Sequence, residues 1–296
     1  ASTSTPSLLG LQAMASGTAS TAVFPELKTT VLPSNGQLLA EETVELVEAS
    51  LAAMRANLAE RPAWSGAPSP TDEFLLMFLR AEVFNPKLAA VRYRKFWQVK
   101  VGLCGEDRAA LPIKAEDACV SLQLDFIQIV TGSKDVEGRQ VILVNAGNAN
   151  RSLDDKLRVL AVWYVLLAAL EDVETQRRGV CFLTSLKTVK FSQQIDPKCN
   201  KAMMETIQGA LPVRIGSINY CYPPSFFRMA WTILSPFLHK GGIVRLAKKS
   251  RVIYGKKVRP PQKFFGTGSI LGNLPPPTGN GVVDLSGWLE ERVRAE

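Results

Sequence analysis

The sequence has few of the residues that metal sites, disulfide frameworks and histidine relays need. Its 296 residues contain one histidine, His239, which excludes every site that requires two. The five cysteines include no CxxC pair and their number is odd, so neither a disulfide framework nor a zinc knuckle is expected. This cysteine usage favours a reducing compartment, and we expect no bound metal and no cofactor.

Long apolar runs are absent as well. The longest unbroken run extends from Val159 to Leu170 and contains twelve residues, whereas a membrane-spanning helix needs about 20. No apolar segment typical of a signal peptide precedes Lys28, the first basic residue. These features predict a cytoplasmic protein without a membrane span.

Motifs of enzymatic chemistry are missing too. We find no GxxxxGK[ST], GxGxxG or GxSxG. The carboxylate pairs Glu41-Glu42 and Asp154-Asp155 fall in the first turns of expected helices, where capping explains them. We therefore expect no catalytic residues and no enzymatic activity.

The composition is that of a folded protein with an uneven charge. Apolar residues make up 46% and charged residues 21% of the chain, which excludes wholesale disorder. The formal net charge is +8, yet nine basic and no acidic residues lie between Lys240 and Val283, so the remainder carries −1. This segment lacks regularly interleaved aromatics, which disfavours nucleic acid and favours an anionic membrane surface.

Changes in periodicity divide the chain into three parts. We expect residues 1–37 to form a disordered tail, residues 38–113 a small helical unit, and residues 114–290 an α/β domain with a mostly parallel sheet. The apolar spacing predicts helices at 41–61, 72–80, from 85 onward, 154–173 and 196–209, and strands at 126–130, 140–144, 179–184 and 215–220.

Residues 223–238 are the least ordinary segment. Pro223-Pro224 is expected to open a helix, and apolar side chains cover almost its whole circumference. An amphipathic surface helix needs an apolar stripe only about 100° wide. Two interpretations stay open: the C-terminal segment covers this helix, or the helix meets a partner, a membrane or a bound apolar molecule.

Five short motifs occur in an order typical of one family. They are Phe78-Leu79-Arg80-Ala81 followed by Phe84, the stretch Asp172–Gly179, Leu211-Pro212-Val213-Arg214 with Ile218 and Pro223, Pro236-Phe237-Leu238, and Val283–Trp288. Together they resemble the CRAL-TRIO lipid-binding family, which includes tocopherol and retinaldehyde carriers and phosphatidylinositol-transfer proteins. The resemblance extends from about residue 72 to 289.

The resemblance implies a CRAL-TRIO fold, in which a helical N-terminal unit packs against the sheet domain and a lid helix closes an apolar cavity. The lid would present Phe226, Phe227, Trp231 and Ile233. Positions that match the cavity lining of the tocopherol carrier are aliphatic here: Val159, Val162, Leu166, Val180, Ile207, Ile215 and Ile218. They would also be apolar as the ordinary core of an α/β domain, so both interpretations remain open.

The resemblance also implies contacts with phosphoinositides. Basic positions of the carrier match Arg214 and Arg245, and a third position falls on Val91, next to Arg92. Four more basic residues are candidates because they lie near these in the sequence: Arg228, Lys240, Lys248 and Lys249.

We therefore expect a monomeric intracellular carrier that binds one hydrophobic small molecule or phospholipid in an internal cavity. It would dock reversibly, as a peripheral protein, on phosphoinositide-containing membranes, and it would bind no nucleic acid. The alternative is a non-transporting lipid-sensing module that docks a partner protein. The sequence does not discriminate among tocopherol, a retinoid, another isoprenoid and a phospholipid as the ligand.

Overall fold

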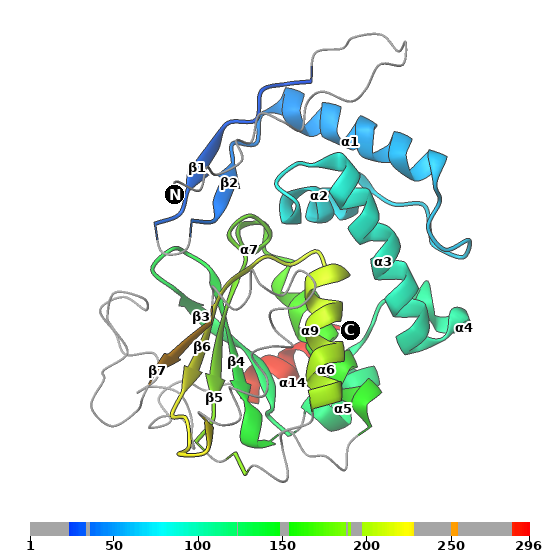
Figure 1. Ribbon diagram of the computed structural model, residues 1–296. Helices are drawn as coiled ribbons and strands as arrows, with labels where there is room; N and C mark the ends of the chain where they lie inside the picture. Colours follow the sequence, from blue (N-terminus) through cyan, green and yellow to red (C-terminus); the bar gives the residue numbers. More distant parts are fainter. Residues whose placement is uncertain are drawn as a thin grey trace, which may run out of the picture.

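A computed structural model of the chain describes residues 24–33, 36–122, 124–148, 154–187, 189–190, 197–227, 250–253 and 286–296. In Figure 1 the N-terminal helices lie at the top of the view, and the sheet with its own helices lies below them. The division into a helical unit of residues 38–113 and an α/β domain of residues 114–290 stays a prediction.

The N-terminal part contains a short hairpin and four helices. Strands β1 (Thr29–Val31) and β2 (Leu38–Ala40) pair antiparallel, and α1 (Val44–Glu60), α2 (Asp72–Ala81), α3 (Pro86–Cys104) and α4 (Glu106–Ala109) follow. The first three helices begin after an N-cap side chain that accepts a hydrogen bond from a backbone N–H three residues on: Thr43, Thr71 and Asn85. The hairpin places ordered backbone within residues 1–37, where we expected a disordered tail; residues 1–23, 34 and 35 are outside the described ranges.

The second part is built around a five-stranded sheet of order β3-β4-β5-β6-β7. Strands β3 and β4 form an antiparallel hairpin, and β4, β5, β6 and β7 are parallel to one another. The predicted α/β class with a mostly parallel sheet is confirmed. In chain order the elements are α5 (Ala115–Leu122), β3 (Ile127–Lys134), β4 (Gln140–Asn145), the 3-10 turn η2 (Ala146–Asn148), α6 (Asp155–Ala169), α7 (Val173–Arg178), β5 (Val180–Ser185), α9 (Pro197–Gly209), β6 (Ile215–Cys221), β7 (Ser250–Ile253) and α14 (Ser286–Ala295).

One hydrophobic core joins the two parts. Ile142, Phe182 and Ile218 stand side by side on β4, β5 and β6, and all three belong to the core that includes residues of α6 and α9. On another side of α6, Trp163 stacks on Phe96 of α3 with ring centroids 5.2 Å apart. Helix α6 thus lies between the sheet and the N-terminal helices (Figure 1), which explains why it is apolar on most sides.

The helix that we predicted over residues 154–173 ends four residues earlier than expected. Helix α6 ends at Ala169 and α7 begins at Val173. The carboxylate of Asp172 caps α7 by accepting hydrogen bonds from the Glu174 N–H at 3.2 Å and the Thr175 hydroxyl at 2.8 Å. The predicted end was wrong because apolar residues continue through the turn after Ala169, whereas the aspartate N-cap starts a new helix.

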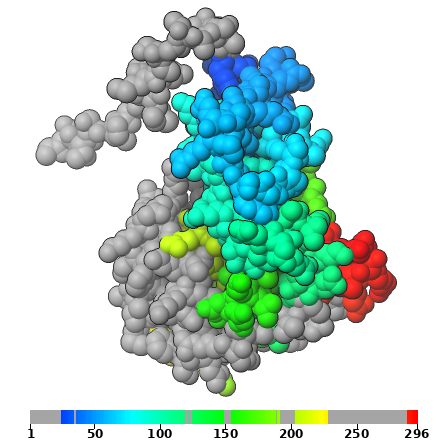
Figure 2. Space-filling model, turned by 90° about the vertical axis from the view of Figure 1, so that its right-hand side faces the viewer, coloured from blue at the N-terminus to red at the C-terminus, as the bar shows by residue number. Residues whose placement is uncertain are grey.

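The last helix is fixed to α5 and α6 by the side chain of Glu296. Its Oε1 accepts a hydrogen bond from the Tyr164 hydroxyl at 2.6 Å, and its Oε2 accepts one from the Ala115 N–H at 2.7 Å. Figure 2 shows α14 in red at the side of the molecule, below the N-terminal helices. In the described part of the chain, the helices are too short or too polar to span a lipid bilayer.

The two carboxylate pairs that we assigned to helix caps behave differently. Asp154 caps α6 by accepting a hydrogen bond from the Lys156 N–H at 2.9 Å, so its assignment is confirmed. Glu42 lies before α1, whose N-cap is Thr43, so the assignment of Glu42 to the first turn of this helix was wrong. The local sequence suggests that both acidic pairs cap a helix. For Glu42, contacts with residues far along the chain decide instead.

Glu42 is held by two arginines from different helices. Its carboxylate accepts hydrogen bonds from Nε and Nη2 of Arg80, at 2.9 and 2.8 Å, and from Nε and Nη2 of Arg177, at 3.0 Å each. The side chains of Glu42 and Arg80 are only 10% and 11% exposed. These charge-assisted bonds therefore fasten the segment between β2 and α1 to both α2 and α7.

We predict that Glu42→Gln lowers the free energy of unfolding by about 2–3 kcal/mol, because the largely buried Arg80 loses its carboxylate partner. Burial raises the pKa of Glu42, but the hydrogen bonds and charges of Arg80 and Arg177 outweigh it and lower the pKa below the ordinary 4.5. The unfolded chain has the ordinary pKa of 4.5 at Glu42, and the folded protein has a lower one. The carboxylate therefore stabilises the fold fully above pH 4.5, and this stabilisation is lost as the pH falls through the lower, folded-state pKa. Urea unfolding at several pH values should show the difference from wild type shrinking in acid.

Glu290→Gln is the matched control. Glu290 pairs with Arg294 at 3.3 Å, but their side chains are 68% and 76% exposed. Exposed pairs contribute about 0–1 kcal/mol, so this variant should unfold almost as wild type does. A loss for Glu42→Gln no larger than that of the control would contradict the role assigned to Glu42.

Candidate functional site

All seven residues that were matched to a lipid cavity lie together in the core. None of them is more than 6% exposed, and all belong to one hydrophobic cluster. Their assignment to a cavity stays a prediction, because packed core residues are equally buried. The seven come from four elements: Val159, Val162 and Leu166 from α6, Val180 from β5, Ile207 from α9, and Ile215 and Ile218 from β6.

A β-bulge explains how two residues three apart in β6 share this core. Val180 pairs with Ile215 whereas Cys181 pairs with Ser217, so Gly216 is the extra residue. Ile215 and Ile218 therefore both join the core with α6 and α9, although strict alternation would put them on opposite faces. A Cβ at position 216 would lie 2.2 Å from Cδ of the buried Arg139, so only glycine fits without a shift of that side chain.

The chain leaves β6 toward the expected lid through an unusual turn. Tyr222 has a φ of 55°, in the left-handed region that non-glycine residues rarely adopt. Beyond it, Phe227 is buried with its ring 5.6 Å from that of Tyr220, and Phe226 is half-buried. The other two expected lid residues, Trp231 and Ile233, lie outside the described residues.

Arg92, from the expected phosphoinositide site, is engaged within the protein. Its Nε donates to Oε1 of Glu82 at 2.5 Å, and its Nη1 donates to the carbonyl oxygen of Leu211 at 2.7 Å. Glu82 is largely buried with it, and the hydrogen bond to Leu211 joins α3 to the chain just before β6. The side chain therefore has an architectural role irrespective of any phosphate.

Arg214 lies close enough to Glu82 to interact with it and is also bound to backbone. Its Nη1 donates to the carbonyl oxygen of Arg177 at 2.9 Å, and its Nη2 donates to that of Leu38. Burial lowers the pKa of Arg214 to about 10, and the charge of Glu82 opposes this change. The remaining expected phosphoinositide residues lie outside the described part of the chain: Arg228, Lys240, Arg245, Lys248 and Lys249.

Comparison with known families identifies the region that holds these features. Residues 125–255 match the CRAL/TRIO domain. This part of the chain is a CRAL/TRIO domain. It contains every strand of the five-stranded sheet, helices α6 and α9, and all seven residues of the expected cavity lining. The family resemblance found in the sequence is thereby confirmed.

The CRAL/TRIO domain has relatives among curated proteins. Clavesin-1 from Xenopus laevis is 27% identical over 174 residues, covering 56% of this chain and 51% of its own length. Alpha-tocopherol transfer protein-like from Mus musculus is 26% identical over 179 residues, covering 56% and 48%. The Homo sapiens protein of the same name is 24% identical over 172 residues, covering 56% and 48%. This chain thus spans about half the length of these relatives.

A solved structure also aligns with the chain. The "Crystal structure of Sfh5" superposes with a TM-score of 0.49 and 12% sequence identity, covering 85% of this chain and 94% of that chain.

The opposite face of the CRAL/TRIO sheet carries a polar cluster that we did not predict. The Sγ of Cys181 accepts hydrogen bonds from the Ser217 hydroxyl at 3.1 Å and from Nδ2 of Asn219 at 3.3 Å, and all three residues are buried. Burial raises the pKa of Cys181 to about 12. Its thiol therefore stays protonated at neutral pH, which suits a structural role and not a nucleophile. In the sequence, the polar residues Ser217 and Asn219 at alternate positions of β6 could have indicated this cluster.

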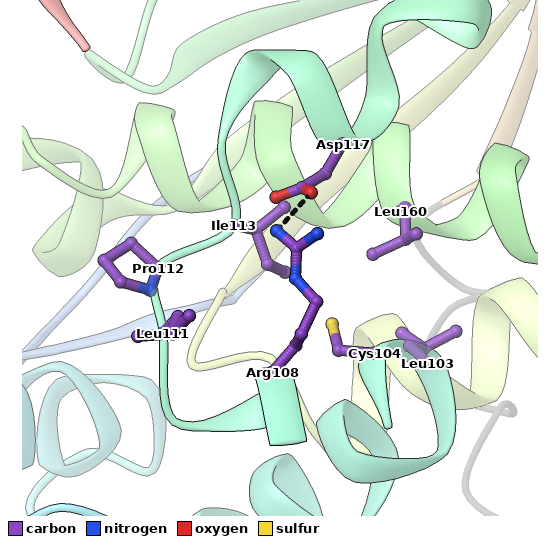
Figure 3. A pocket seen from close by; sticks show the side chains of 8 residues that line it. All are labelled: Leu103, Cys104, Arg108, Leu111, Pro112, Ile113, Asp117 and Leu160. Atoms are coloured by element: carbon purple, nitrogen blue, oxygen red, sulfur yellow. Dashed lines mark hydrogen bonds and ion pairs between the residues drawn. The ribbon is translucent and has the colours of Figure 1, made fainter. Parts of the chain in front are cut away.

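A small hollow lies beside α6, next to α3, α4 and α5. Its volume is about 160 Å³. Figure 3 shows Arg108 reaching across it toward Asp117, with which it pairs at 2.7 Å. A space of this size holds a molecule about as large as benzene, so it is not the expected lipid cavity. The lining consists of Leu103, Cys104, Arg108, Leu111, Pro112, Ile113, Asp117 and Leu160.

Gly179 allows α7 to approach β6 closely, and this contact generates a prediction. Its φ is 86°, and a Cβ there would lie 2.2 Å from the carbonyl oxygen of Arg214. We expect Gly179→Ala to lower the free energy of unfolding by about 2–4 kcal/mol, from the strained φ and the forced shift of backbone. Denaturant unfolding provides the measurement.

Gly102→Ala is the control for this substitution. Gly102 lies in α3, and a Cβ there would meet nothing within 4 Å. Alanine in an exposed helical position is favoured over glycine by up to about 1 kcal/mol, so this variant should be as stable as wild type or more so. Equal free energies of unfolding for the two alanine variants would show that the close approach at Gly179 does not contribute to stability.

Proposed function

We propose that this chain binds one hydrophobic, lipid-like molecule and carries it between membranes. The observation that carries the proposal is the aliphatic surface shared by α6, α9, β5 and β6, which lies inside the CRAL/TRIO domain. Relatives of this domain include proteins named alpha-tocopherol transfer protein-like. The seven expected lining residues supply aliphatic groups only, as an apolar ligand requires.

The sheet topology puts α6 and α9 on one side of the sheet. Strands β4, β5, β6 and β7 are parallel and follow one another in one direction across the sheet. Crossovers between parallel strands are almost always right-handed, so α6, which follows β4, and α9, which follows β5, lie on the same side. We propose that the ligand binds on that side.

The hydrophobic effect would dominate retention of the ligand. A molecule that loses about 300 Å² of apolar surface gains roughly 7 kcal/mol at ~25 cal/mol per Å². A basic residue near an anionic bilayer contributes about 1 kcal/mol, and less in salt. In this proposal the apolar site decides whether the ligand stays bound, and basic residues decide where the protein docks.

We assign docking mainly to the basic segment after residue 239. It contains nine basic and no acidic residues between Lys240 and Val283. Arg92 and Arg214 already donate to acceptors inside the protein, which leaves them fewer N–H groups for a phosphate. The proposed phosphoinositide contacts are therefore Arg245 and its neighbours Arg228, Lys240, Lys248 and Lys249, with Arg214 at their edge.

A volume-filling substitution distinguishes a cavity from a solid core. Val162 belongs to the proposed lining and Val165 does not, although both are buried valines of α6. Overpacking a solid core costs about 1–3 kcal/mol. We expect Val165→Phe to lose this stability in denaturant unfolding. Val162→Phe should lose little stability but should retain less lipid, measured by native mass spectrometry of the purified protein.

Two results would contradict the cavity. One is equal destabilisation by the two phenylalanines, and the other is the absence of any lipid bound by wild-type protein offered a range of lipids. An exchange assay between two populations of liposomes then tests carriage itself. Lipid that binds but never exchanges would favour the alternative, a lipid-sensing module that docks a partner protein.

Charge removal tests the docking surface. We expect the combined substitutions Arg245→Gln, Lys248→Gln and Lys249→Gln to weaken binding to phosphoinositide-containing vesicles by about 3 kcal/mol at low salt, on the order of 100-fold. Arg92→Gln is the comparison, since its guanidinium pairs with Glu82, and it should reduce stability more than vesicle binding. Vesicle co-sedimentation measures both variants. A greater loss of vesicle binding for Arg92→Gln than for the triple variant would reverse this assignment.

A further inference from the structure

Helix α6 carries a buried arginine with incomplete partners. Arg158 is 4% exposed, and its Nη2 donates to the carboxylate of Asp155, whose side chain is itself 55% exposed. The Nε of Arg158 is buried and has no hydrogen-bond partner among the residues that the structure describes. A guanidinium is always charged and carries five N–H donors. Its burial beside one solvent-exposed carboxylate is therefore unfavourable unless another acceptor is supplied.

Arg139 shows how the same chain compensates a buried arginine inside its architecture. Arg139 pairs with Asp135 at 3.1 Å and with Glu137, and both carboxylate side chains are almost as buried as the arginine. The positive charge of Arg139 thus meets two negative charges in the interior. Among the described residues, Arg158 pairs with one carboxylate, at the surface, so its charge is less compensated than that of Arg139.

Helical periodicity puts Arg158 in line with the proposed lipid site. Arg158, Val162 and Leu166 are spaced four residues apart and form one stripe of α6. Leu160 lies almost opposite Arg158 on the helix and lines the hollow of Figure 3, and Trp163 packs against α3. Arg158 therefore extends the row of proposed lining residues by one turn toward the start of α6.

The position of that turn suits the polar end of a ligand. Helix α6 follows the carboxyl end of β4, and its first residue is Asp155. In open parallel sheets, ligands bind beyond the carboxyl ends of the strands. The aliphatic lining would hold the apolar part of the molecule, and Arg158 would lie where a charged end group must be accommodated.

We propose that Arg158 binds a negatively charged oxygen, of a carboxylate or a phosphate, at the polar end of the carried lipid. The inference rests on the proposed function and narrows its ligand from any apolar molecule to an anionic amphiphile. A guanidinium can donate two parallel hydrogen bonds to either group. A neutral lipid would leave the buried charge without its acceptor, so the site discriminates against it.

Three lipids with the same chain test this inference: oleate, oleyl alcohol and oleoyl lysophosphatidate. Each competes with a neutral fluorescent lipid probe for the full chain, below its micellar concentration. We expect wild type to bind at least one of the two anions about tenfold or more tightly than the alcohol, as expected for a charge-assisted pair. The stronger of the two anions identifies carboxylate or phosphate as the preferred group.

Two substitutions separate recognition from stability. Arg158→Gln should reduce the preference for the anion to within about twofold of the alcohol. Asp155→Asn should keep or increase the preference, because the lipid anion becomes the nearest negative charge to the arginine. Thermal melting of each variant reports folding. A purely structural role for Arg158 would lower the melting temperature of both variants without changing the order of the three lipids.

The outcomes distinguish this inference from the function on which it rests. Wild-type protein that binds none of the three lipids would overturn the role of Arg158, and it would overturn the proposed function only if native mass spectrometry also finds no other bound lipid. Wild-type protein that binds all three equally, or an Arg158→Gln variant that keeps the anion preference, would overturn the role of Arg158 and leave lipid carriage standing. Should Arg158→Gln fail to fold, a loss of the anion preference in Asp155→Asn would still refute the inference.

Discussion

The stack of Trp163 on Phe96 is the contact on which the rest of the architecture depends. It packs α6 against α3, while other side chains of α6 join the core beneath the sheet. Because α6 is buried on most sides, the N-terminal helices and the sheet share one core and support each other. The ion pairs of Glu42 with Arg80 and Arg177 fasten the same junction at its other end. The lipid site proposed for the CRAL/TRIO domain is therefore carried by a rigid frame.

Arginines serve three purposes in this frame, and only their surroundings tell them apart. Arg80 and Arg177 share a carboxylate that ties two parts of the chain together. Arg92 and Arg214 donate to a carboxylate or to carbonyl oxygens across element boundaries. Arg158 lies buried and, within the described ranges, pairs with a single exposed carboxylate. A buried charge is tolerable only when it is compensated, so the degree of compensation indicates which arginine is available to a ligand.

The two faces of the sheet differ in chemistry as well as in packing. The side that faces α6 and α9 presents aliphatic groups from β5 and β6, and the bulge at Gly216 brings Ile215 and Ile218 onto it together. The other side holds a buried hydrogen-bonded cluster of Cys181, Ser217 and Asn219. The hydrogen-bonded cluster thus distinguishes the second side from the first, although aliphatic residues such as Val141 and Leu183 lie on it too.

Features that depend on neighbouring residues could be predicted from the sequence, and features that depend on distant residues could not. The α/β class and the helix starts after Thr71 and Asn85 follow from the sequence, because apolar spacing and N-caps act over a few residues. The start of the first helix after Thr43 did not, since we expected it at Glu41. The family resemblance and a set of buried aliphatic positions could also be read there. Only the tertiary structure decided that Glu42 pairs with two distant arginines, that a bulge turns two isoleucines to one side, and that Arg158 is buried beside one exposed carboxylate. Those outcomes depend on groups far apart in the chain, whose distances and solvation are set only when the fold brings them together.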